Sequence, residues 1–76
     1  MNNQKRKELN KAIELLKQAQ EIVDTIMNEE QDGFDNLSEG IQQSMRGEAM
    51  EEAISNMETA SGCIDEAINA IEEASL

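Results

Sequence analysis

The 76-residue chain contains no histidine, tryptophan, tyrosine or proline, and it has a single phenylalanine and a single cysteine. Histidine is the usual general base of enzymes and the commonest metal ligand, so its absence removes most acid–base and zinc chemistry. Cys63 lacks a histidine to activate it and a second cysteine to pair with. No glycine-rich loop precedes a lysine, so a P-loop is also absent. We therefore expect a protein without enzyme activity, cofactor or metal ion.

Long apolar runs are missing as well. No stretch approaches the roughly 18 uninterrupted apolar residues of a membrane span, and the basic start is not followed by the apolar segment of a signal peptide. A free thiol such as Cys63 fits a reducing compartment. The sequence predicts a cytoplasmic protein.

Charge is unevenly distributed along the chain. Residues 1–17 hold five basic and two acidic residues, a net +3, whereas residues 18–76 hold fifteen acidic residues and Arg46, a net −14. So negative a surface repels phosphate groups, which argues against nucleic acid or an anionic membrane as a direct partner. It is compatible with a basic protein partner, and equally with glutamates that serve only solubility.

Apolar residues recur at heptad spacing in two segments, which predicts two amphipathic helices at about 4–30 and 46–75 with a connector at about 31–45. The fold class expected is all-α, a single antiparallel helical hairpin over residues 1–76. Antiparallel packing also places the basic start of the first helix beside the acidic end of the second. The predicted packing or oligomer seam comprises Leu9, Ile13, Leu16, Val23, Ile26, Met50, Ala53, Met57, Ala60, Ile64, Ala67 and Ile71.

A hairpin this small leaves part of each apolar stripe in water, and its stability is marginal. Two hairpins that pair into a four-helix bundle cover those stripes. The pattern therefore predicts a homodimer or a higher homo-oligomer. The alanines at every seventh position from Ala53 to Ala74 favour close approach of a partner helix.

The connector carries turn-forming and polar residues together with Arg46, the only basic residue after Lys17. We expect Asn36 to begin a short helix, with Glu39 three residues later completing a capping box, and Ser44 to begin the second long helix. Arg46 has two interpretations: an ion pair with a neighbouring acid, or the anion-binding element of a polar pocket. The residues proposed to line that pocket are Phe34, Asp35, Asn36, Ser38, Gln42, Ser44, Arg46 and Gly47.

The connector also resembles the central segment of small helical proteins encoded by phages and prophages. That segment runs aromatic-Asp-Asn-Leu-Pro-Glu, then Leu or Ile, Gln, Ser, Arg-Gly-Glu and Met-Glu, and Ser38 stands here in place of the proline. The resemblance implies a phage or prophage setting, hence the host-cell cytoplasm, but no particular activity. The matching residues are Phe34, Asp35, Asn36, Leu37, Glu39, Ile41, Gln42, Ser44, Arg46, Gly47, Glu48, Met50 and Glu51.

Several functions stay open at this point. The first is a counter-defence protein that sequesters a small anionic, nucleotide-like ligand through the connector. The second is an acidic inhibitor or adaptor that engages a basic host protein, and the third is a structural or assembly role. A minor enzymatic alternative is Mg²⁺ held by carboxylates at both ends of the connector, as in all-helical nucleotide pyrophosphohydrolases.

Overall fold

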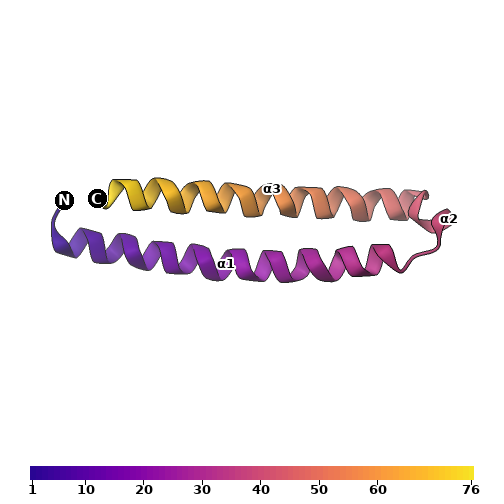
Figure 1. Ribbon diagram of the computed structural model, residues 1–76, viewed down its shortest axis with the longest axis horizontal. Coiled ribbons are helices and arrows are strands. Elements are labelled where there is room, and N and C mark those ends of the chain that lie inside the picture. The colour runs from indigo at the N-terminus through magenta and orange to yellow at the C-terminus, as the bar shows by residue number, and fades with distance from the viewer.

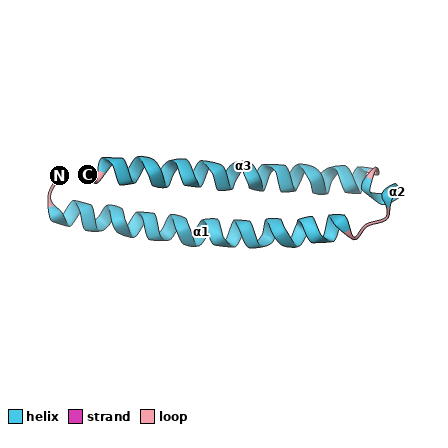
Figure 2. Ribbon diagram, in the orientation of Figure 1, coloured by secondary structure: helices cyan, strands magenta, loops and turns pink.

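The computed structural model describes all 76 residues as two long helices joined by one short helix. Helix α1 spans Asn3–Asp35, α2 spans Glu39–Gln42 and α3 spans Met45–Ala74. Figures 1 and 2 show α1 and α3 lying side by side in opposite directions, with α2 at the turn and both termini at the other end. The predicted all-α antiparallel hairpin is confirmed.

The basic and acidic ends of the chain meet as the charge pattern predicted. The Nε of Arg6 donates a hydrogen bond to the main-chain oxygen of Ser75 over 3.2 Å. Further along, the side-chain amide of Gln20 donates to the main-chain oxygen of Ser61 over 3.0 Å. In an antiparallel pair, residues at the same level have numbers with a constant sum, and both contacts give 81. The two contacts therefore define a single register along the helix pair.

Helix α1 runs five residues beyond its predicted end. Phe34 follows Met27 by seven residues and so continues the apolar face toward α3, which favours helix through that position. Gly33 in the last turn lowers helix stability by only about 1 kcal/mol relative to alanine, too little to end the helix. The connector between the long helices is therefore shorter than predicted, spanning residues 36–44.

The predicted cap at Asn36 is wrong. Because α1 continues to Asp35, Asn36 ends that helix: its backbone N–H donates to the carbonyl of Asp32, and the N–H of Leu37 donates to the carbonyl of Phe34. Ser38 instead begins α2: its backbone is extended, and its side chain accepts a hydrogen bond from the N–H of Ile41. The predicted cap at Ser44 is confirmed, since its hydroxyl accepts from the N–H of Gly47 at the start of α3.

The two long helices meet along one seam whose residues alternate three and four apart, the spacing of a coiled coil. Only Ile13 and Ile68 in this seam are almost fully buried, each 6% exposed. Two helices alone therefore cover little of the apolar surface. The buried and half-buried seam positions are Leu9, Ile13, Leu16, Gln20, Val23, Met27 and Phe34 on α1, and Met50, Ile54, Met57, Ser61, Ile64, Ile68 and Ile71 on α3.

Part of the predicted packing seam lies outside this interface. Ile26 is 45% exposed, Ala53 and Ala60 are exposed, and Ala67 is half-buried at the margin. The reason is size. Ile54 and Ile68 each follow an alanine by one residue, and turning the larger side chain toward α1 removes more apolar surface from water.

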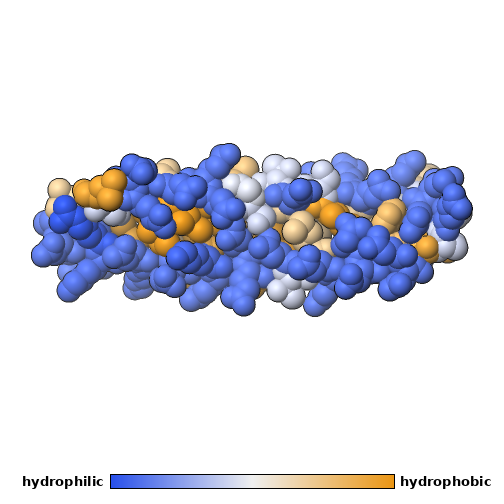
Figure 3. Space-filling model, in the orientation of Figure 1, coloured by the Kyte–Doolittle hydropathy of each residue, from blue (hydrophilic) through white to orange (hydrophobic).

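The resulting molecule is a rod. Its principal extents are 58 × 15 × 12 Å and its radius of gyration is 17.2 Å, against roughly 11 Å for a compact domain of this length. On the face drawn in Figure 3, hydrophilic side chains predominate and apolar ones show along the line between the helices. None of the helices is both long enough and apolar enough to cross a membrane.

Candidate functional site

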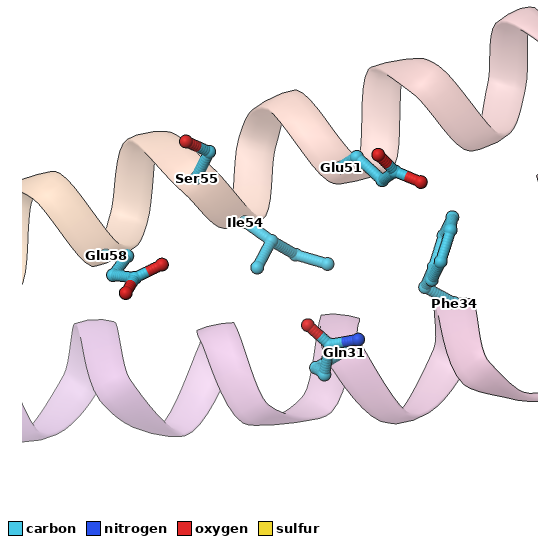
Figure 4. Close-up of a pocket in the computed structure, with 6 residues that line it drawn as sticks. All are labelled: Gln31, Phe34, Glu51, Ile54, Ser55 and Glu58. Atoms are coloured by element: carbon cyan, nitrogen blue, oxygen red, sulfur yellow. The ribbon is translucent and has the colours of Figure 1, made fainter.

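A pocket of about 300 Å³ lies between α1 and α3, toward the connector. Figure 4 shows side chains from both helices around it, with the Phe34 ring and the Ile54 side chain projecting into the space between the helices. The lining residues are Gln31, Phe34, Glu51, Ile54, Ser55 and Glu58.

The helical period explains why these side chains meet. On α3 the four lining residues are spaced three, one and three apart, which puts them on one face, and Gln31 and Phe34 are likewise three apart on α1. The pocket opens where the seam lacks an apolar side chain. Glu30 occupies the seam position between Met27 and Phe34, and it is exposed. We attribute the unfilled space to that carboxylate turning outward.

The pocket combines an apolar floor with an acidic rim. Phe34 and Ile54 supply the apolar surface, Glu51 and Glu58 supply two carboxylates, and no basic residue lines it. Lysine and arginine side chains match this arrangement, because they carry an apolar stem and a cationic end. An arginine also stacks on aromatic rings and forms strong hydrogen bonds to carboxylates. The pocket is therefore suited to a basic side chain and repels an anion.

A further carboxylate lies near the inner end of the pocket. Asp24 precedes Gln31 by seven residues, so the two lie on the same face of α1. Gln20 contacts Ser61 across the hairpin. Four residues further along α1, Asp24 is therefore level with Met57 on α3, which is followed by Glu58. Its Oδ1 is buried and has no hydrogen-bond partner. Leaving a buried acceptor unpaired costs about 1–3 kcal/mol. Asp24 thus adds an unsatisfied negative group to this side of the hairpin.

The structure gives most of the predicted connector residues a role in the turn. Ser38 and Ser44 cap helices, Asn36 ends α1, and the side-chain amide of Gln42 donates to the main-chain oxygen of Phe34 over 2.9 Å. Asp35 accepts a hydrogen bond from Gln31 over 2.9 Å.

Gly47 is buried because α3 passes directly over the end of α2. A Cβ built there would overlap the main-chain carbonyl of Gln42 and lie 2.6 Å from the carbonyl oxygen of Ile41. Arg46, by contrast, is exposed and takes no part in the hydrogen bonds that fix the connector. Of the eight residues proposed for the ligand site, Phe34 alone lines the pocket.

Sequence reasoning missed the other five lining residues. The glutamates among them looked like part of a solvated acidic face. One signal was available: Glu30 falls on the heptad position where an apolar residue belongs, next to the only aromatic residue of the chain. Such a vacancy beside a large ring indicates a hollow in the seam.

The acidic residues do not gather into a metal centre in this structure. No group of three or more aspartate, glutamate or cysteine side chains is placed to hold an ion. The carboxylates near the connector are spread along two helices instead.

Comparison with protein-family models, with curated proteins and with solved structures gives no significant match to this chain. The resemblance of the connector to phage-encoded helical proteins stays a hypothesis drawn from residues 34–51.

Proposed function

We propose that the protein is a non-enzymatic interaction module, an acidic inhibitor or adaptor that engages a basic protein. The observation that carries this proposal is the chemistry of the pocket. Phe34 and Ile54 form its apolar floor, and Glu51 and Glu58 its acidic rim. In the complex, a lysine or arginine of the partner inserts its stem against the floor and its charge between the carboxylates.

The charge around the pocket supports the same function. Residues 18–59 carry eleven acidic residues and Arg46, a net −10, whereas residues 1–17 and 60–76 together carry six acidic and five basic residues, a net −1. The pocket lies in the first of these two parts. A field of one sign raises the rate at which an oppositely charged partner arrives, and complementary charge fixes its orientation.

The resemblance to phage proteins gives the partner a setting. A phage-encoded inhibitor acts on a host protein, and a strongly negative rod competes with nucleic acid for a basic surface. We therefore propose a host protein with a nucleic-acid-binding surface as the partner, and counter-defence as the biological role.

Binding of a short Arg- and Ala-containing peptide, measured by fluorescence anisotropy at low and high salt, tests the proposal. We expect Glu51→Gln with Glu58→Gln to weaken binding by roughly tenfold or more, because both charge-assisted contacts are lost. The matched control is Glu66→Gln with Glu73→Gln, which removes the same charge at the far end of α3. Equal weakening in the two double variants would show that the pocket has no special part and would overturn the proposal.

A second candidate is the binding of a small anionic, nucleotide-like ligand at the connector. One observation favours it: Arg46 is exposed and is not used by the hydrogen bonds of the turn. In this alternative the guanidinium binds the anion, and the backbone N–H groups at the start of α3 assist.

A further inference from the structure

One face of the hairpin carries large apolar side chains that nothing covers. On α1, Leu15 is 58% exposed, Ile22 is 62% exposed and Ile26 is 45% exposed. With Ala12 and Ala19 they form a second stripe whose members are alternately three and four residues apart. That spacing is the one a further partner helix requires.

Helix α3 carries a matching stripe of small side chains with the same spacing. It includes Ala53, Ala60 and Cys63, which are exposed, and the half-buried Ala67. Each member of this stripe precedes a seam residue by one position; Ala74 precedes Ser75, which continues the seam spacing after Ile71. The full set is Ala49, Ala53, Asn56, Ala60, Cys63, Ala67, Ala70 and Ala74.

The two stripes lie on the same side of the hairpin. On each helix the stripe precedes the seam by one residue, which rotates it by about 100° about the helix axis. The two helices face each other and run in opposite directions. A stripe rotated from the seam by the same angle about each helix axis therefore lies on the same side of the hairpin for both helices. The pocket residues Glu51, Ser55 and Glu58 lie on the other side, since Glu51 and Glu58 follow seam residues by one position and Ser55 follows Ile54.

We propose that this apolar face binds a second copy of the chain, with the two hairpins running in opposite directions to form a four-helix bundle. The available area is sufficient. Each rod offers a face of 58 by 15 Å, roughly 900 Å², and stable interfaces bury roughly 800 Å² on each partner.

Charge selects the orientation. A copy laid in the same direction would place the net −10 of residues 18–59 against the same net −10. A copy laid in the opposite direction places that region against the partner's residues 1–17 and 60–76, where the five N-terminal basic residues lie. The opposite direction removes the like-charge repulsion and adds attraction.

The residue pattern is self-complementary in this orientation. With a two-fold axis at the level of Ala19, Leu15 of the α1 stripe lies against the second copy's Ile22, and Ala12 lies against its Ile26. About Ala60, the α3 stripe pairs Ala53 with Ala67 in the same manner. Ala19 and Ala60 lie within about two residues of the same level on the rod, roughly 3 Å, so one two-fold axis serves both helices.

Light scattering at micromolar concentration tests the face. We expect a mass of twice the 8.5 kDa of one chain. Leu15→Gln with Ile22→Gln should raise the dissociation constant by at least about a hundredfold, while Glu14→Gln with Glu21→Gln on the same helix leaves it unchanged. A monomeric mass for the unaltered chain, or equal association in the two variants, overturns the proposal.

Crosslinking tests the orientation in a chain whose fold is little disturbed. In a Cys63→Ser background, Ala60→Cys places two thiols beside the two-fold axis, within the range that a disulfide needs. With dissolved oxygen as the oxidant, we expect the two thiols to form a disulfide-linked dimer roughly tenfold faster than in Ser55→Cys, which lies on the opposite face. A dimer that does not crosslink faster at position 60 overturns the opposite-direction arrangement. Peptide binding at the pocket is unaffected by either outcome.

Discussion

Gln20 joins the two long helices at the centre of the rod through its side-chain amide. The amide donates to the main-chain oxygen of Ser61 over 3.0 Å and to the carboxylate of Asp65 over 2.7 Å. Both seam residues of this layer, Gln20 and Ser61, are polar, whereas their neighbours along the seam are apolar. A polar pair in an otherwise apolar seam fixes the register between helices, since a shifted register leaves the amide without partners.

Gln20→Ala should lower the free energy of unfolding by about 1–2 kcal/mol, because two hydrogen bonds are lost. Gln18→Ala is the matched control, an exposed glutamine of the same helix, and we expect it to change stability by less than about 0.5 kcal/mol. Urea denaturation followed by circular dichroism measures both. Equal stability of the two variants would show that the amide does not hold the register.

Gly47→Ala should be among the most damaging single-methyl additions. Its Cβ would overlap the carbonyl of Gln42, and backbone cannot move aside as the end of a side chain can. We expect a loss of roughly 3 kcal/mol in stability. Gly62→Ala is the control: nothing lies within 4 Å of its Cβ, and alanine in a helix interior adds about 1 kcal/mol. Thermal unfolding should therefore move in opposite directions for the two variants.

Asp24→Ala should stabilise the hairpin and weaken its binding to a basic peptide. The Oδ1 of Asp24 is buried without a hydrogen-bond partner, so its removal should add about 1 kcal/mol beyond the gain from the helix propensity of alanine. Glu21→Ala, an exposed acid in the interior of the same helix, is the control that supplies mainly the propensity gain. If Asp24→Ala is no more stable than Glu21→Ala, the carboxylate is paired in solution.

Arg46→Ala separates the two candidate functions. It leaves the pocket intact, so binding of the Arg- and Ala-containing peptide should be unchanged or slightly stronger, because one like charge is removed. Binding of a nucleotide-like anion at the connector should be abolished. Isothermal titration with a cyclic dinucleotide and with the peptide, on the same preparations, measures both. Loss of anion binding together with unchanged peptide binding would place both sites on one chain.

Salt should affect the interaction with a basic partner strongly. The Debye length shortens from about 10 Å at 0.1 M to about 3 Å at 1 M, so steering by exposed carboxylates fades over that range. We expect the association rate to fall by at least about tenfold while the dissociation rate changes little. Stopped-flow fluorescence resolves the two rates. An association rate that is independent of salt would contradict an acidic binding surface.

The long helices were predictable because their pattern is repeated and local. Heptad spacing alone placed both, and Ser44 marked the start of α3 correctly. The end of α1 was predicted five residues too early, although the heptad spacing from Met27 to Phe34 reaches past that point. Gly33 suggests a stop in the sequence, and only the packing of Phe34 against the opposite helix explains why the helix continues through it.

The seam shows a second limit of the sequence. Isoleucines and alanines stand side by side on α3, so two overlapping heptad stripes exist, and either one can face α1. The choice depends on how much apolar area each stripe of α3 buries against α1. That area depends on both helices together and cannot be derived from the spacing on α3 alone. The pocket depends on the pair in the same way: Glu30 marks a gap in its own helix, but the gap stays a hollow only because Glu30 lies level with Glu51 in this register and not with a large apolar residue.

The contact between Arg6 and Ser75 brings the two ends of the polypeptide together. A linker of a few flexible residues would therefore join the C-terminus to the N-terminus without straining either helix, and new ends could be opened in the exposed turn. In such a circular permutant α3 precedes α1, and we expect the packing between them to be unchanged. The fold of the hairpin thus depends on the contacts between α1 and α3 and not on the order of the two helices along the chain.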